Sequence, residues 1–111
     1  MSTPYEQHPD RFLHMDSGII VRLVLKGDRY GREGCLTHDQ DDPLVEFYDG
    51  DYDYDHTPWL GVKGQFISSY NLSTLLEHES GGLDLDGGQP KWQMNYLEFW
   101  YVRQWLWSRN P

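Results

Sequence analysis

Cysteine is almost absent from this 111-residue chain, and basic side chains and long apolar runs are scarce. The single Cys35 excludes an intramolecular disulfide framework and a four-cysteine zinc site, and it favours a reducing, cytoplasmic compartment. Arg22 interrupts the longest apolar run, residues 19–25, so we expect no signal peptide or membrane-spanning helix. With 9 Lys and Arg against 18 Asp and Glu, direct binding to nucleic acid or to an anionic membrane is not expected.

Aromatic side chains, in contrast, are abundant. The chain carries 5 Trp, 8 Tyr and 4 Phe, so 15% of its residues are aromatic and 38% are hydrophobic. A chain of 111 residues corresponds to one domain, and this composition supplies bulky apolar area for its core. The composition therefore predicts a folded single domain rather than a disordered chain.

The negative charge is concentrated in the middle of the chain. Residues 1–32 hold four acidic and five basic side chains, residues 33–90 hold 13 acidic ones and only Lys63, and residues 91–111 hold one acidic and three basic ones. Residues 33–55 contain nine acidic side chains and no Lys or Arg. Such a segment has two interpretations: it keeps a small protein soluble, or its field attracts a strongly basic partner.

Apolar periodicity and turn residues predict an α+β domain over residues 17–111, preceded by a partly ordered leader over residues 1–16. Strands are predicted at 19–25, with a short return strand near 29–31, and then at 43–48, 65–70 and 92–94. Alternation in strand 43–48 predicts that Val45 and Phe47 face the core and that Glu46 and Tyr48 face the other way. We expect a mainly antiparallel sheet of three to five strands.

Two helices are predicted to pack on this sheet. Asn71 precedes a short apolar stretch and is a candidate N-cap for a helix of about two turns. Asn95 with Glu98 three positions later resembles a capping box that begins a terminal helix ending near Trp107.

The terminal helix carries two apolar stripes. At about 100° per residue, one stripe contains Phe99, Val102 and Leu106, and a second stripe lies roughly a third of a turn away. The sequence favours coverage of the second stripe by the N-terminal leader over a partner or dimer interface. The members of the second stripe are Tyr96, Trp100 and Trp107.

Metal and catalytic motifs are incomplete. Residues 49–55 place Asp at every second position, but a calcium loop starting at Asp49 would have Tyr54 at its sixth position and Leu60 at its twelfth, where Gly and Glu are required. Cys35 and His38 are spaced like half a zinc site without a second pair, and as a nucleophile and base they support an enzyme only as a minor alternative. We expect no enzyme, cofactor or metal.

The segments GCLTHDQDDPLVEFYD and GQFISSYNLSTLL, followed by GGLDLDGGQPKW and a terminal RQWLW, resemble small acidic proteins carried by conjugative elements and phages of proteobacteria. The resemblance covers about residues 28–107 and is one of overall pattern. It implies a role against host defence, as in antirestriction and anti-CRISPR proteins, some of which present acidic side chains in place of DNA phosphates. It assigns no catalytic residue.

The leading hypothesis is a non-enzymatic module whose acidic face occupies the nucleic-acid groove of a basic DNA- or RNA-binding protein. Alternate carboxylates on an extended segment would lie about 6.6 Å apart, close to the spacing of phosphates along one strand. The alternative is a structural or dimeric interaction protein that uses the second stripe of the terminal helix, with its acidic charge serving solubility. The predicted contacts of the acidic face are Asp39, Asp41, Asp42, Glu46, Asp49, Asp51, Asp53 and Asp55, with Tyr52, Tyr54 and Trp59 as anchors.

Overall fold

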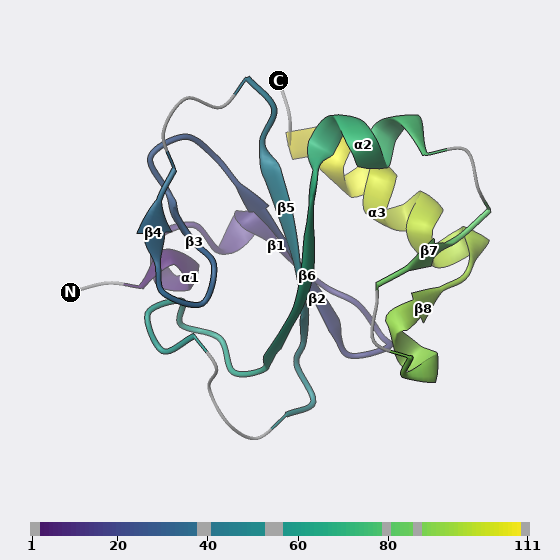
Figure 1. Cartoon of the computed structure of the whole chain (residues 1–111), viewed down its shortest axis with the longest axis horizontal. Helices are drawn as coiled ribbons and strands as arrows, with labels where there is room; N and C mark the ends of the chain where they lie inside the picture. Colours follow the sequence, from purple (N-terminus) through teal and green to yellow (C-terminus); the bar gives the residue numbers. More distant parts are fainter. Residues whose placement is uncertain (1–2, 38–40, 53–56, 79–80, 86–87, 110–111) are drawn as a thin grey trace.

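The computed structural model describes residues 3–37, 41–52, 57–78, 81–85 and 88–109. Its centre is a four-stranded antiparallel sheet in the order β1-β2-β5-β6 (Figure 1). The strands are β1 (Phe12–His14), β2 (Ile19–Val24), β5 (Leu44–Asp49) and β6 (Gln65–Asn71). The predicted fold class, α+β with a mainly antiparallel sheet and a C-terminal helix, is confirmed.

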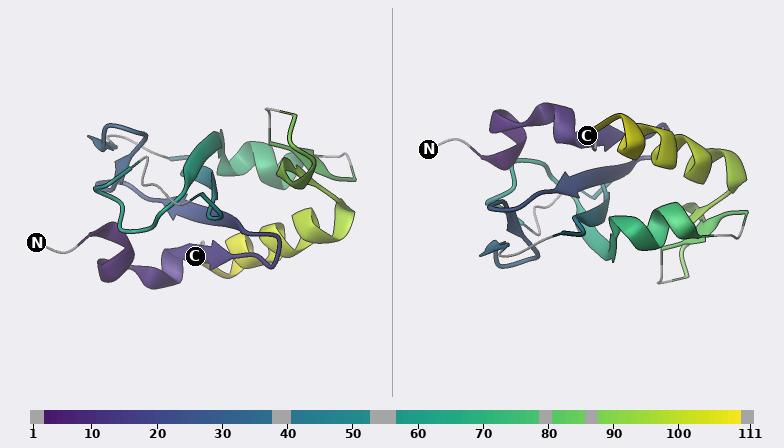
Figure 2. Two further views of the ribbon diagram at one scale, coloured as in Figure 1. Left: turned by 90° about the horizontal axis from the view of Figure 1, so that it is seen from below. Right: turned by 90° about the horizontal axis from the view of Figure 1, so that it is seen from above.

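The other helices and strands surround this sheet. They are α1 (Pro4–Gln7), η1 (Pro9–Arg11), β3 (Arg29–Tyr30), β4 (Cys35–Leu36), α2 (Leu72–Glu77), β7 (Leu83–Asp84), η2 (Pro90–Trp92), β8 (Gln93–Met94) and α3 (Tyr96–Arg109). Figures 1 and 2 show α2, α3 and the β7–β8 pair gathered on one side of the molecule. The α1 helix and the β3–β4 pair lie on the other side.

Both faces of the sheet are buried. On the first face, Val21, Leu23, Val45 and Phe47 belong to a large core cluster that also contains the apolar side of α3. On the second face, Phe12, Ile20, Tyr48 and Leu60 form a smaller cluster. Because successive side chains of a strand point to opposite faces, every residue from Val45 to Asp49 is enclosed by one layer or the other.

The N-terminal segment supplies part of the second layer, which corrects the expectation that regular structure begins near Ser17. Residues Phe12–His14 form an edge strand paired with β2, and the Tyr5 amide donates to the Leu60 carbonyl at 3.0 Å. Val45 and Phe47 face the main core as predicted, but the opposite face is not open to solvent. Its cover comes from residues distant in sequence, which alternation within one strand does not reveal.

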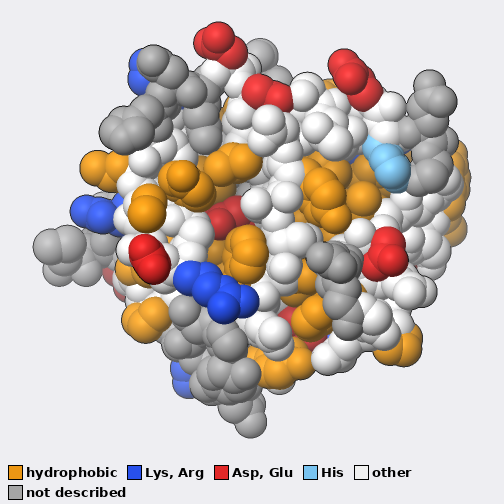
Figure 3. Space-filling view, in the orientation of Figure 1, with side chains coloured by type: hydrophobic (Ala, Val, Ile, Leu, Met, Phe, Trp, Pro, Cys, Tyr) orange, Lys and Arg blue, Asp and Glu red, His pale blue; other side chains and the backbone are white. Residues whose placement is uncertain are grey.

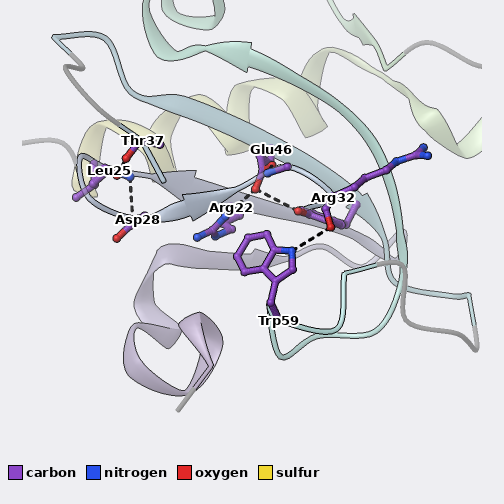
Figure 4. A network of polar contacts seen from close by, with 9 residues as sticks. Arg22, Leu25, Asp28, Arg32, Thr37, Glu46 and Trp59 are labelled. Atoms are coloured by element: carbon purple, nitrogen blue, oxygen red, sulfur yellow. Dashed lines mark hydrogen bonds and ion pairs between the residues drawn. The ribbon is translucent and has the colours of Figure 1, made fainter. Parts of the chain in front are cut away.

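The predicted hairpin between residues 19–25 and 29–31 is wrong. β3 pairs with β4 instead of returning along β2, because β1 and β5 occupy the two edges of β2. The chain leaves β2 through a turn in which the Asp28 amide donates to the Leu25 carbonyl at 3.0 Å. Asp28 Oδ2 also accepts from the Leu25 amide at 3.0 Å (Figure 4), so this side chain closes the turn.

The two predicted helices are present. Asn71 is the N-cap of α2, but its side chain makes no cap hydrogen bond. Asp42, two residues before β5, accepts from the Ser73 amide at 2.9 Å instead. For α3 the capping box is confirmed, since Asn95 Oδ1 accepts from the Glu98 amide at 2.9 Å and Glu98 Oε1 accepts from the Asn95 amide at 3.0 Å. These bonds satisfy amides that the first turn leaves without helical partners.

An ion pair lies inside the second layer. Arg22 of β2 is directly opposite Glu46 of β5, and Arg22 Nη1 is 2.7 Å from Glu46 Oε1 with both side chains almost fully buried. Glu46 also accepts from the Tyr48 hydroxyl at 3.1 Å and from the Gly31 amide at 2.9 Å. Three donors therefore replace the water that this carboxylate loses on burial.

Removing one member of this pair should cost more than removing both. We expect Arg22→Met to lower the free energy of unfolding by about 3–5 kcal/mol, because the Glu46 carboxylate remains buried without its counter-charge. The double variant Arg22→Met/Glu46→Met should lose less, since no unpaired charge is left inside. Denaturant unfolding measures both, with the exposed Arg32→Met as control. Equal losses in the single and double variants would contradict this account.

Candidate functional site

The predicted acidic face loses several of its carboxylates to the interior. Glu46 and Asp49 are 1% and 0% exposed, so neither can contact a partner in this fold. Asp42 is bound to both the amide and the hydroxyl of Ser73 at the start of α2. These hydrogen bonds lower the pKa of Asp42 below its ordinary value. These three acidic side chains therefore have structural roles.

Asp49 and Asp51 converge on one lysine rather than forming part of an extended array. The chain turns at Gly50 and Asp51 after β5. Lys91 Nζ lies 2.6 Å from Asp49 Oδ1 and 2.6 Å from Asp51 Oδ2. Trp92 Nε1 donates to Asp49 Oδ2 at 2.8 Å. The two negative charges are thus shared with a cation from the far end of the chain, which corrects the predicted alternation of free carboxylates.

The pKa values of this cluster follow from the same contacts. Burial raises the pKa of the Asp49 carboxyl, but hydrogen bonds from Lys91 and Trp92 outweigh it and leave the pKa below 3.8. Burial lowers the pKa of the Lys91 ammonium, but Asp49 and Asp51 outweigh it and leave the pKa above 10.5. Both groups therefore remain ionised over the whole neutral range.

The remaining predicted contacts are dispersed. Asp41 is exposed, whereas Tyr52 packs against the main core and accepts from Gln89 Nε2 at 3.1 Å. Trp59 lies in the second layer, where Arg22 stacks on it. On the face seen in Figure 3, carboxylates lie singly or in pairs among uncharged and apolar atoms. Four predicted contacts lie outside the described residues: Asp39, Asp53, Tyr54 and Asp55.

Lys91 should stabilise the fold in a pH-dependent way. We expect Lys91→Met to lower the free energy of unfolding by about 2 kcal/mol at neutral pH, because it leaves Asp49 buried and unpaired. The pKa of Asp49 is depressed in the fold, so this stabilisation is present above its unfolded pKa. It is lost as the pH falls below about 4.

Unfolding curves of wild type and Lys91→Met between about pH 2 and pH 8 measure this difference. Lys63→Met is the matched control, because Lys63 is exposed and makes no ion pair with the described residues. The account fails if the two lysine variants lose equal stability at neutral pH, or if the Lys91 effect does not shrink in acid.

Five of the six exposed large hydrophobic side chains of the described residues lie on α3. The buried side of this helix consists of Phe99, Val102 and Leu106, as predicted. Residues of the N-terminal segment lie near both ends of the helix: Arg109 Nε donates to the Asp10 carbonyl at 2.8 Å, and Met15 lines a groove with Leu97 and Tyr101. They leave the second stripe open, since Tyr96, Trp100 and Trp107 are 49% to 62% exposed. The favoured interpretation, in which the leader covers the second stripe, is therefore wrong. We call the exposed set the α3 surface; it comprises Tyr96, Leu97, Trp100, Tyr101 and Trp107, between 49% and 70% exposed.

Leu97 and Tyr101 fall outside the predicted stripe. On the helix they lie about 100° further round than Tyr96 and Trp100. A helical wheel drawn for the whole helix, rather than for the two stripes, would have shown these two apolar side chains as well. Next to them is a groove of about 410 Å³ between α3 and the turn that joins β1 to β2. Its walls include Met15 and Tyr101, so the α3 surface is continuous with a shallow hollow.

Metal and catalytic candidates gain no support from the described geometry. Within the described ranges, no group of three His, Cys, Asp or Glu side chains is placed to hold a metal ion. Cys35 is exposed in β4, and its proposed partner His38 lies outside the described residues. Among the helices of the described chain, none has the length and apolar character needed to cross a bilayer.

Comparison with known proteins identifies no related protein. No family model matches the chain, and searches of curated proteins and of solved structures find no match. The function is therefore inferred from the geometry of the chain itself.

Proposed function

We propose that this protein is a non-enzymatic interaction module that pairs with a second copy of itself through the α3 surface. The observation that carries the proposal is the exposure of five large apolar side chains on a helix whose opposite side is already buried in the core. Surface helices normally present polar side chains to water. A helix that is apolar on both sides is expected to be covered on both.

The size of the α3 surface fits a modest interface. Its four aromatic side chains are 49% to 62% exposed, and a fully buried aromatic side chain covers about 150–250 Å². Roughly 400 Å² per copy is therefore available before Leu97 and the rim are counted. Typical stable interfaces bury about 800 Å² per partner, so we expect a weak, reversible dimer.

Charge favours this helix as the place of contact. Residues 91–111 carry one acidic and three basic side chains, whereas the whole chain carries a net charge of −9. Two copies therefore repel each other least where their α3 helices meet. A pair across a twofold axis would bring the two α3 helices together antiparallel. The helix dipoles are then also opposed favourably.

The acidic-mimic hypothesis is less well supported than the α3 surface. Glu46 and Asp49 are buried, and Lys91 partly neutralises Asp51. The resemblance to antirestriction and anti-CRISPR proteins remains compatible with an interaction module, and a basic nucleic-acid-binding protein remains the alternative partner. The two hypotheses predict opposite responses to salt, because acidic mimicry weakens with ionic strength while apolar pairing of two like-charged chains strengthens.

The α3 surface should control the mass of the protein in solution. We expect wild type to shift from monomer to dimer as its concentration rises, and to do so more readily at high salt. Trp100→Glu should remain monomeric over the same range, because a carboxylate at the centre of the contact would be desolvated. Sedimentation equilibrium or light scattering after gel filtration measures the mass.

Thr74→Glu on α2 is the matched control, since it adds the same charge at an exposed helical position outside the α3 surface. It should associate like wild type. A monomeric wild type at every concentration and salt would refute self-association. Dimers that persist in Trp100→Glu would place the contact elsewhere.

A further inference from the structure

A cavity of about 420 Å³ lies on the opposite side of the sheet from the α3 surface. It is bounded by the N-terminal α1–η1 segment, by β2 and by the turn that leads into β3. Part of its wall is apolar, with Phe12, Leu36 and Trp59 among the lining residues. Its volume falls at the lower end of the range for small-molecule sites, about 300–1,000 Å³.

Arg22 lies at the base of this cavity. Only 2% of it is exposed, and its guanidinium carbon is 5.3 Å from the Trp59 ring centroid and 5.8 Å from that of Phe12. Arg22 Nη1 donates a hydrogen bond to Glu46 Oε1, and within the described part of the chain no second acceptor is hydrogen-bonded to the Arg22 side chain. Arg22 is among the residues that line the cavity, so its guanidinium brings a buried positive charge, paired with Glu46, close to it.

Trp59 is held in a fixed orientation beside this guanidinium, as Figure 4 shows. Its Nε1 donates to the Arg32 carbonyl at 3.3 Å, and its ring lies against Gly34, where an added Cβ would be 3.3 Å away. The ring is therefore fixed before any ligand arrives. An apolar group entering the cavity can contact the part of the ring that lines it with little loss of side-chain entropy.

Two further arginines complete the lining. Arg29 is exposed, with Nη1 donating to the Gly34 carbonyl at 2.9 Å. The Arg11 side chain is 28% exposed, and its Nε is 4.0 Å from Asp10 Oδ2, too far for a hydrogen bond. Among the described residues of the lining, Asp28 is the one carboxylate, and its Oδ2 is engaged by the Leu25 amide. With Arg22 paired to Glu46, Arg11 and Arg29 still outnumber Asp28 in the described lining.

We infer that this cavity binds a small organic phosphate that carries a flat ring, of the size of a nucleoside monophosphate. The phosphate would be bound by Arg11 and Arg29, because guanidinium groups match phosphate oxygens in pairs. The ring would pack on Trp59. This site is independent of self-association through α3, since the sheet separates the two.

Titration calorimetry at low salt tests the inference with three probes: adenosine monophosphate, adenosine and inorganic phosphate. We expect adenosine monophosphate to bind at least tenfold more tightly than either of the others, because it alone makes both contacts. Its binding should shift the Trp59 indole N–H resonance in a ¹H–¹⁵N spectrum. Failure of adenosine monophosphate to bind at millimolar concentration would overturn the inference.

Variants locate the phosphate contact without disturbing the buried ion pair. Arg11→Gln and Arg29→Gln should each weaken binding of adenosine monophosphate roughly tenfold. Arg32→Gln removes the same charge from a neighbouring exposed side chain outside the lining and should have no such effect. Equal weakening by all three variants would mean that only the general field attracts the anion, and would overturn the site. Equal affinity for inorganic phosphate would overturn the role of the ring.

Discussion

The ion pair between Arg22 and Glu46 constrains half of this molecule. It places two charges at the middle of the two central strands, where a layer of apolar side chains alone could not satisfy them. The Tyr48 hydroxyl and the Gly31 amide complete the contacts of the carboxylate, while Phe12 and Trp59 cover the guanidinium. The N-terminal segment, the β3–β4 pair and residues 57–64 thus meet around one buried charge pair.

Pairing with protein donors also accounts for several of the acidic side chains. Asp42 accepts a hydrogen bond from the first turn of α2, and Glu46 accepts one from Arg22. Asp49 is paired with Lys91 and accepts a hydrogen bond from Trp92. Protein donors take the place of water around each of these three carboxylates. A sequence rich in Asp and Glu therefore need not present a strongly negative surface. A net charge of −9 measures composition and not the field at any one face.

The two proposed sites follow from the layered arrangement. A chain of 111 residues builds one layer on each side of the sheet, and no further element is placed over the outer side of α3 in the described structure. The second layer consists of short elements such as α1, which spans only Pro4–Gln7. Short pieces fill space less completely than a long helix, and a cavity remains above Arg22. One side therefore offers an apolar surface and the other a cationic cavity.

Local patterns in the sequence determined the strands at 44–49 and 65–71, the helix that begins after Asn95, and the division of α3 into a buried and a second stripe. These follow from alternation, capping and helical period, which act over a few residues. Only the tertiary structure decided that Glu46 is buried, that Lys91 pairs with Asp49, and that Trp59 packs on Arg22. Those contacts join residues that are 24, 42 and 37 positions apart in the chain. A pattern within one segment carries no record of which distant segment will cover it, because burial depends on the whole packed chain.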